Sequence, residues 1–277
     1  MIGFMRPKTE ELLYLLLWSC DMLARPTFRN LTDSFESWAY RNGLHRQLGE
    51  LERQKFLESH APAVETIAPS ERVLRLTETG RVHALGGRDP ELYWRRRWDG
   101  RWRLVLFDLP VAQSRTRDRL RNYLRRHGFG YLQNSVWISP DRLQEEKAIL
   151  TGSRANVESL IVLEARPCAG ETDEEIVAGA WDFDGINRLY AKHMKLLNAR
   201  PAGPLRNKVA ARTFRKWATE ERNAWLAAVT EDPLLPKSLL PQDYLGHKAW
   251  LLRVKSLREA AEQLRSFSAS AAAPNPA

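Results

Sequence analysis

The sequence predicts an α+β protein built from three consecutive parts, and three observations support this prediction. The first 85 residues contain short amphipathic helical segments and then a strand-like segment. From Trp102 onward, short apolar runs that end at prolines alternate with helical segments, and from residue 171 helical periodicity dominates. We therefore expect domains over residues 1–85, 92–168 and 171–266, followed by a disordered tail over residues 267–277.

Length and composition bound the class of protein. The chain has 277 residues, of which 43% are hydrophobic and 28% charged, so it can bury a core and is not a disordered chain. The longest apolar run near the start, Leu12 to Trp18, is far shorter than the roughly 20 residues that span a bilayer. Glu10 and Glu11 lie directly against this run, which a signal peptide would avoid. We therefore expect neither a membrane-spanning nor a secreted protein.

Cysteine usage indicates the compartment. Cys20 and Cys168 are far apart, and neither lies in the CxxC or CxxH spacing of a zinc site. We expect both to be buried thiols in a protein of the reducing cytoplasm.

The net charge of +9 is concentrated in one segment. Residues 91–130 contain 11 Lys and Arg against 4 Asp and Glu, whereas residues 1–90 contain 12 of each kind. A basic segment of this kind indicates a partner that carries phosphates, from nucleic acid or from a phosphorylated ligand.

The first domain has the pattern of a winged helix-turn-helix. Apolar spacing predicts helices over residues 9–24, 30–39 and about 44–57, and Val73 to Thr77 predicts a strand. Gly80 is expected to close this strand. In this fold the third helix enters the major groove of DNA, and the hairpin lies along the backbone. The exposed face of the third predicted helix carries five side chains suited to such contacts: His45, Arg46, Gln47, Glu50 and Arg53. The same pattern also fits a three-helix protein-interaction module.

A segment of interleaved Trp and Arg, Trp94 to Arg103, follows a hinge predicted at residues 84–90. Its rings could stack on bases while its arginines bind phosphates. They could instead pack beneath the next domain while the guanidinium groups reach water, and we favour this second interpretation.

The central segment predicts a small ferredoxin-like domain. Its apolar, aromatic and β-branched runs predict three strands, Leu104 to Pro110, Tyr131 to Ile138 and Glu158 to Glu164. Two helices are predicted between them, over residues 113–127 and 141–151, and the apolar side of the first is Leu120, Tyr123 and Leu124. Short connections between alternating strands and helices are typical of this fold.

The remainder of the chain predicts a helical domain. Helices are expected over residues 172–180, 184–197, 205–229 and 247–266.

Motifs of common catalytic chemistry are absent from the sequence. It has no P-loop, GxGxxG, GxSxG or HExxH motif, and its six histidines show no metal-ligand spacing. We therefore predict no enzyme activity, no cofactor and no metal site. Asp108 ends the first predicted strand of the central domain, where carboxylates from two paired chains could hold a divalent ion and activate water. A metal-dependent nuclease that uses Asp108 is the alternative function, and a structural role in which Asp108 caps a turn or faces an arginine is the competing explanation.

Several segments resemble the PaaX family of bacterial transcriptional repressors. The first signature runs from Trp98 to Pro110 and continues in Gly128-Phe-Gly130 and in Val136 to Pro140. The second runs from Asp232 to His247, and Trp181 with Tyr190 falls where the family has such a pair. The segment Arg75 to Gly80 matches a third, looser pattern.

The resemblance implies a winged helix, a central ferredoxin-like domain similar to that of CRISPR adaptation nucleases, and a helical C-terminal domain. It also implies a homodimer that occupies double-stranded promoter DNA of a catabolic operon, such as one for phenylacetate. An aryl-acyl-CoA thioester such as phenylacetyl-CoA would release it, from a pocket in the helical domain or at its junction with the central domain. In this interpretation the proposed phosphate contacts are Arg53, Arg72 and Arg75, with auxiliary contacts from Arg95, Arg96 and Arg97.

Two positions depart from the family pattern. The family usually has Arg where this chain has Glu50, and Gly where it has Lys55. Glu50 would repel phosphate, although it could accept a hydrogen bond from cytosine. An RNA-binding or protein-binding adaptor that uses the Trp-Arg segment is a further alternative.

Overall fold

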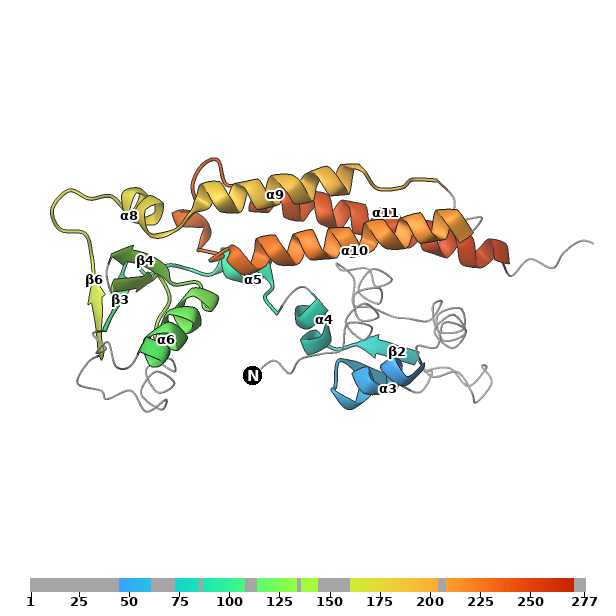
Figure 1. Cartoon of the computed structure of the whole chain (residues 1–277), viewed down its shortest axis with the longest axis horizontal. Coiled ribbons are helices and arrows are strands. Elements are labelled where there is room, and N and C mark those ends of the chain that lie inside the picture. The colour runs from blue at the N-terminus through green and yellow to red at the C-terminus, as the bar shows by residue number, and fades with distance from the viewer. Residues whose placement is uncertain are drawn as a thin grey trace, which may run out of the picture. The chain divides into compact units, whose positions relative to one another are not determined.

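The computed structural model describes residues 45–60, 73–84, 87–107, 114–133, 136–143, 160–203 and 208–271 (Figure 1). The chain divides into two compact units. One comprises residues 1–88, 192–226 and 247–277, and the other comprises residues 89–191 and 227–246.

A four-stranded antiparallel sheet forms the centre of the second unit. Its strands are β3 (Trp102–Phe107), β4 (Gly130–Gln133), β5 (Val136–Ser139) and β6 (Leu160–Ala165). Their spatial order is β4-β5-β3-β6, and every neighbouring pair is antiparallel. Helix α6 (Ser114–Arg126) connects β3 to β4. From β3 to β6 the described elements follow the order β-α-β-β-β, which has one strand more than the three predicted for the ferredoxin-like central domain; most of the second helix predicted there, residues 144–151, lies outside the described residues.

The prediction of a single strand from Tyr131 to Ile138 was wrong. The chain reverses inside this segment, so that Tyr131 of β4 lies opposite Trp137 of β5, with a register shift between Tyr131 and Gln133. The aromatic and β-branched pattern is the same on both sides of the reversal, so it predicts a strand without showing where the strand turns back.

The core of this unit lies between the sheet and α6. Val105, Phe107 and Trp137 of the sheet pack with Leu124 and Phe129, all at most 4% exposed. Leu120 and Tyr123 pack against the same cluster, which confirms the apolar side predicted for α6.

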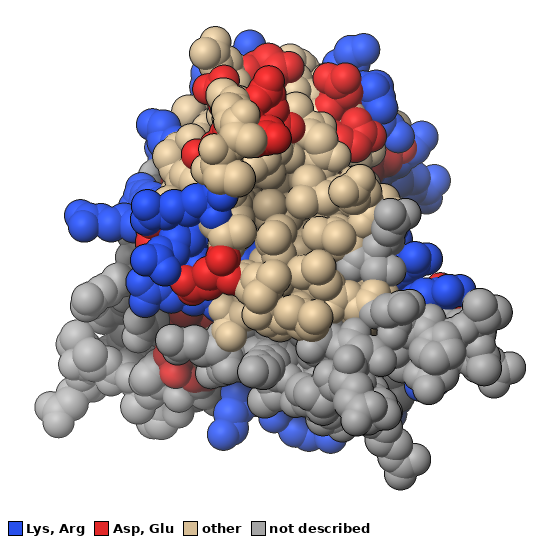
Figure 2. Space-filling view, turned by 90° about the vertical axis from the view of Figure 1, so that its left-hand side faces the viewer, with Lys and Arg blue, Asp and Glu red and all other residues tan. Residues whose placement is uncertain are grey.

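The other face of β6 is apolar and open. Val162 packs against the core, whereas its neighbours Ile161 and Leu163 are 54% and 48% exposed, as expected where successive side chains alternate between faces. Figure 2 shows a broad surface of uncharged residues, with Lys and Arg and also Asp and Glu at its margins.

A two-stranded antiparallel hairpin follows helix α3 (His45–Arg53). It consists of β1 (Leu57–His60) and β2 (Val73–Leu76), and Leu57 lies opposite Leu76. The helix predicted to reach residue 57 ends four residues earlier, because Lys55 takes a left-handed conformation with φ of 59°. The helices predicted over residues 9–24 and 30–39 lie outside the described residues.

A short helix that the sequence did not predict, α4 (Glu78–Ala84), follows β2. Gly80, expected to close the strand, lies within this helix, where any Cβ would collide with the carbonyl oxygen of Phe56. Helix α5 (Pro90–Arg95) begins at the last residue of the predicted hinge, and the Asp89 side chain caps it by accepting a hydrogen bond from the Glu91 amide.

The helices predicted in the last hundred residues are confirmed. They are α8 (Asp173–Ala180), α9 (Phe183–Asn198), α10 (Lys208–Glu231) and α11 (Gly246–Ala271), with the short 3₁₀ helix η3 (Lys237–Leu239). Helix α11 extends to Ala271, so the first residues of the predicted tail are helical. No helix in the described part of the chain is long and apolar enough to span a membrane.

One cysteine prediction was wrong. Cys168 is exposed, because it lies in the loop that connects β6 to α8. Cys20 lies outside the described residues.

Candidate nucleic-acid interface

Helix α3 separates a buried face from a polar one. Leu48 and Leu51 are 4% and 0% exposed, at the three-residue spacing of one helix face. Arg46 is exposed and Gln47 is partly buried. The side chain of His45, the first residue of the helix, is outside the described set. Of the two residues predicted to contact bases, Arg46 lies on the exposed face of α3. Gln47 lies four residues before the buried Leu51, and its Oε1 is shielded from water with no hydrogen-bond partner among the described residues.

Glu50 organises the C-terminal half of this polar face. Its carboxylate accepts two hydrogen bonds from Arg53 Nη2, at 2.6 and 2.7 Å, and one from Gln54 Nε2 at 2.5 Å. The Arg53 side chain is 74% exposed, so this is a surface ion pair. An exposed pair of this kind contributes at most about 1 kcal/mol, and a phosphate could compete for the same guanidinium.

The left-handed Lys55 ends α3. The Phe56 amide donates to the Leu51 carbonyl and the Lys55 amide donates to the Glu52 carbonyl, each at 2.9 Å. These two bonds form a Schellman motif, whose left-handed residue is usually glycine because a Cβ is disfavoured there. The family's usual glycine at this position therefore suits the geometry better than this chain's lysine does.

Thr77 ties the end of α3 to the hairpin. Its hydroxyl donates to the Lys55 carbonyl at 2.8 Å, and its amide donates to the Phe56 carbonyl at 3.0 Å. The same hydroxyl accepts a hydrogen bond from the Gly80 amide. The helix, the hairpin and α4 are thus joined at one point, which fixes the hairpin relative to α3.

The predicted hairpin contacts are only partly described. Arg75 lies in β2 opposite Glu58 of β1, and its side chain is outside the described set. Arg72 lies outside the described residues altogether. Phosphate contacts by these two arginines stay predictions.

The structure separates the three predicted auxiliary arginines. Arg96 binds both carboxylate oxygens of Asp141, at 2.6 and 3.0 Å, and also donates to the carbonyls of Tyr93 and Leu234. It is therefore a structural arginine. Arg97 is exposed, and Arg95, which is 78% exposed, lies 3.4 Å from a Glu91 oxygen.

The tryptophans of this segment pack in the protein, as we favoured from the sequence. The second part of that interpretation, that the guanidinium groups reach water, was wrong for Arg103 and Arg96, which are 3% and 22% exposed. Trp94 and Trp102 are 5% and 1% exposed, and Trp102 Nε1 donates to Asp173 of α8 at 2.8 Å. Trp98 lies against Trp102 with ring centroids 5.2 Å apart. Trp102 thus joins the sheet to α8, Trp94 packs against Tyr244, and these two buried rings are not free to stack on bases.

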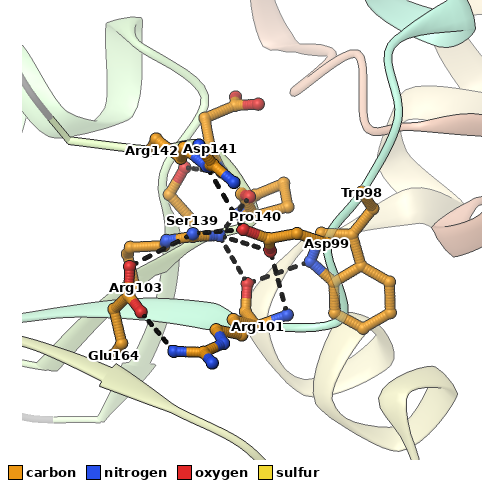
Figure 3. Close-up of polar contacts among 9 residues, drawn as sticks. All are labelled: Trp98, Asp99, Arg101, Arg103, Ser139, Pro140, Asp141, Arg142 and Glu164. Carbon is orange, nitrogen blue, oxygen red and sulfur yellow. Dashed lines mark hydrogen bonds and ion pairs between the residues drawn. The ribbon is translucent and has the colours of Figure 1, made fainter.

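An ion-pair cluster occupies the turn before β3 (Figure 3). Arg103 is 3% exposed and binds both oxygens of Asp99, at 2.5 and 2.8 Å. It also donates to the Pro140 carbonyl at 3.1 Å and to Glu164 at 3.2 Å. Hydrogen bonds from Arg103 hold the pKa of Asp99 well below its usual range. The tight turn between them uses Gly100 at φ of 72°, a conformation that favours glycine.

A second polar cluster surrounds Asp232, which is 1% exposed. Its Oδ2 accepts hydrogen bonds from the hydroxyls of Tyr190, at 2.5 Å, and Tyr244. Its Oδ1 accepts the Leu234 amide at 2.8 Å, which fixes Leu234 at a positive φ of 52°. Burial and the neighbouring carboxylate raise the pKa of both tyrosines, so both hydroxyls stay protonated and donate.

Two signature glycines leave room for aromatic rings. A Cβ at Gly130 would lie 2.7 Å from the Trp181 ring, whose Nε1 donates to the Gly128 carbonyl at 3.2 Å. A Cβ at Gly246 would collide with the Tyr244 ring. Both positions therefore require glycine because an aromatic ring lies against the backbone.

A buried cluster on three helices, α9, α10 and α11, was not predicted from the sequence. Glu221 Oε1 accepts hydrogen bonds from Arg253 Nε at 2.8 Å and from His193 Nε2 at 2.9 Å, and all three side chains are 0% exposed. Arg253 also lies 4.5 Å above the Trp225 ring. The sequence does contain a signal for this cluster. His193 follows Tyr190 by three residues and precedes Leu197 by four, so a histidine lies on the buried face of α9 between these two residues.

The described part of the chain contains no group of three or more His, Cys, Asp or Glu that could hold a metal ion. Asp108, the residue of the alternative nuclease function, lies outside it.

Two family models match the regions of the chain that contain these polar clusters. The family model of the PaaX protein central Cas2-like domain matches residues 95–177, and that of the PaaX-like protein C-terminal domain matches residues 181–270. The chain belongs to the PaaX family. The Asp99 and Arg103 pair lies in the first matched region, and Tyr190, Asp232 and Tyr244 lie in the second. The segments that carried the resemblance in the sequence thus include the polar clusters and close ring contacts of these two regions.

Two relatives extend this comparison. The chain is 25% identical over 205 residues to the transcriptional repressor PaaX of Escherichia coli strain K12, a match that covers 72% of this chain and 62% of that protein. It shares its fold with the uncharacterized protein Rv0674 from Mycobacterium tuberculosis, with a TM-score of 0.55 and 19% identity. That similarity covers 95% of this chain and 99% of the other.

Proposed function

We propose that this protein is a sequence-specific DNA-binding transcriptional regulator. The observation that carries the proposal is its membership of the PaaX family, in which a curated relative is a transcriptional repressor. The same relative supports the prediction that the chain is not an enzyme. The exposed Arg46 on a helix that is fixed to a following hairpin supplies a fitting interface.

In this proposal α3 lies in the major groove and the β1-β2 hairpin lies along the backbone, as in a winged helix-turn-helix. Arg46 and Gln47 contact base edges, because each of these side chains can make two hydrogen bonds to a base. Arg53, Arg72 and Arg75 bind phosphates. Arg53 must release Glu50 in order to bind a phosphate, so Glu50 lowers the affinity for DNA.

The protein acts as a homodimer that represses a catabolic operon and is released by an aryl-acyl-CoA thioester such as phenylacetyl-CoA. Release follows if the effector prefers a dimer geometry in which the two α3 helices no longer match the half-site spacing. A shift of occupancy from 99:1 to 1:99 requires about 10⁴-fold differential affinity, or roughly 5.5 kcal/mol.

Fluorescence anisotropy tests this function directly. The probes are the duplex upstream of the protein's own gene and a scrambled duplex of equal length, each over a salt series. We expect the first to bind at least about 10³-fold more tightly than the second. Equal binding to both, with a steep salt dependence, would contradict a sequence-specific regulator.

Two further arms test the recognition residues and the effector. The double variant Arg46→Ala with Gln47→Ala should lose the preference for the upstream duplex, whereas Lys255→Ala, an exposed residue of α11, should keep it. Phenylacetyl-CoA should release bound DNA at concentrations where coenzyme A alone does not. If no member of a panel of acyl-CoA thioesters changes the anisotropy, this effector class is wrong.

A further inference from the structure

The basic segment of residues 91–130 contains two different kinds of arginine. Apart from the exposed Arg97, the arginines that precede α6 face carboxylates: Arg95 with Glu91, Arg96 with Asp141, Arg101 with Glu164, and Arg103 with Asp99. The other kind lies in α6, whose sequence Ser-Arg-Thr-Arg-Asp-Arg-Leu-Arg-Asn-Tyr-Leu-Arg-Arg contains six arginines and one aspartate. The excess positive charge of the segment is therefore located on this helix.

The arginines of α6 form two rows beside its solvent-facing line. Arg117, Arg121 and Arg125 follow one another at four-residue spacing, and Arg119 and Arg126 lie seven residues apart on the other side. Leu120, Tyr123 and Leu124 hold the opposite face against the sheet. The core packing thus fixes which face of the helix presents its positive charge to solvent.

Among the described residues, no ion pair involves these rows, and Asp118, which lies between them, is the only carboxylate of α6. Arg119, Arg125 and Arg126 are exposed, and none of the ion pairs among the described residues involves them. The Nε atoms of Arg117 and Arg121 are shielded from water and have no hydrogen-bond partner there. Like charges at four-residue spacing destabilise a helix by about 0.2–0.5 kcal/mol per pair, so an anionic partner would relieve repulsion within α6.

We infer that the exposed face of α6 is a second DNA-binding surface, which contacts the phosphate backbone of the duplex without reading its sequence. This inference rests on the proposed DNA-binding function and adds a surface outside α3 and the hairpin. The helix has 13 residues and is about 20 Å long. A duplex carries one negative charge for about every 1.7 Å of its axis, so it can meet both rows along the whole length of α6. The compact phosphate groups of a nucleotide cofactor could reach only part of them.

The test removes the three exposed charges and measures the salt dependence of binding. The full-length variant Arg119→Gln, Arg125→Gln, Arg126→Gln is compared with wild type and with the control variant Lys192→Gln, Lys195→Gln, Lys255→Gln. The control loses the same charge from exposed positions of α9 and α11. Each variant is titrated into the upstream and the scrambled duplex over a salt series, and circular dichroism checks that it is folded.

The α6 variant should bind both duplexes about 10- to 100-fold more weakly at 0.15 M salt, with an unchanged preference between them. The slope of log K against log salt should fall by up to about 2.7, which is 0.9 for each lost phosphate contact. The control should keep the wild-type slope. Wild-type affinity and slope in the α6 variant, or equal losses in the control, would overturn the inference while leaving the proposed function intact.

Two other outcomes separate the inference from the proposed function. If wild type binds both duplexes equally and the α6 variant loses that binding, the proposed sequence-specific regulator is contradicted. The inference that α6 contacts DNA is then supported. If the α6 variant binds DNA normally but no longer responds to acyl-CoA, the surface belongs to the effector phosphates and the inference is overturned. Preference of α6 for single-stranded RNA over the duplex, measured by competition, would overturn it as well.

Discussion

Arg103 and Asp99 form a two-point ion pair across a four-residue turn, with both guanidinium Nη atoms bound to the carboxylate at 2.5 and 2.8 Å. Arg103 is 3% exposed, and the same side chain also binds the Pro140 carbonyl. The pair therefore joins the start of β3 to the segment that follows β5. Arginine here connects parts of the central domain and is not available for nucleic acid.

Replacing Arg103 should be costly for this reason. We expect Arg103→Ala to lower the free energy of unfolding by about 3 kcal/mol, because it removes a buried side chain with several hydrogen bonds and takes the donor from the buried Pro140 carbonyl. Urea unfolding followed by tryptophan fluorescence measures the change. Arg101→Ala is the matched control, since Arg101 is 52% exposed and binds Glu164 at the surface; it should change stability by less than about 0.5 kcal/mol. Equal effects of the two variants would refute the structural role of Arg103.

Lys55 gives a prediction of the opposite sign. Its φ of 59° disfavours any residue with a Cβ, so Lys55→Gly should stabilise the fold by about 1 kcal/mol. Lys55→Ala removes the same charge and keeps the Cβ, and it should bring no gain. Thermal unfolding of the three proteins compares them, and a gain in the alanine variant equal to that in the glycine variant would assign the effect to charge.

Glu50 should weaken DNA binding through its contact with Arg53. Glu50→Gln releases Arg53 and removes a negative charge beside the phosphates, so affinity for both duplexes should rise by about 5-fold, which corresponds to about 1 kcal/mol. The salt slope should steepen by about 0.9 as Arg53 gains a phosphate. Glu262→Gln, an exposed position of α11, serves as control. Unchanged affinity in Glu50→Gln would show that Arg53 does not contact DNA.

Stability should depend on pH through His193. Burial and the nearby Arg253 lower the pKa of His193 from 6.5 to about 3. Above pH 6.5 His193 is neutral in both the folded and unfolded chain, so its contribution to stability is fully present. As pH falls below 6.5 the unfolded chain gains a proton that the folded chain does not, and between pH 6.5 and 5 the free energy of unfolding should fall by about 2 kcal/mol.

The variant His193→Gln tests this assignment, because glutamine can still donate to Glu221 but does not titrate. Its unfolding free energy should fall less between pH 6.5 and 5 than that of wild type, whereas His127→Gln, at an exposed histidine, should behave like wild type. Identical pH profiles of His193→Gln and wild type would exclude His193 as the source.

The sequence predicted elements more accurately than their ends and reversals. The helices expected over residues 172–180 and 184–197 match α8 and α9 to within one residue at each end, because apolar spacing is a local property. The end of α3 at Lys55 and the reversal between β4 and β5 were missed. Neither position carries the glycine that usually marks such a turn, so the local signal was weak.

In the candidate interface, too, local spacing predicted some features and missed others. Residue type and helical spacing located the polar face of α3 with Arg46, Glu50 and Arg53, but did not show that Gln47 is partly buried. They were not enough to distinguish Arg96, which is bound to Asp141, from the exposed Arg97. These two arginines are adjacent in the sequence, and their difference depends on a carboxylate 45 residues away.

By itself, the sequence determined the α+β class, the helical C-terminal region and the location of the excess positive charge, since each depends on composition or on spacing between near neighbours. Only the tertiary structure decided which arginines hold the fold together and which remain on the surface of α6. It also placed Asp232 between Tyr190 and Tyr244, and Glu221 between His193 and Arg253. A charged side chain is structural or available to a ligand according to its partners across the fold, and local spacing carries no information about those partners.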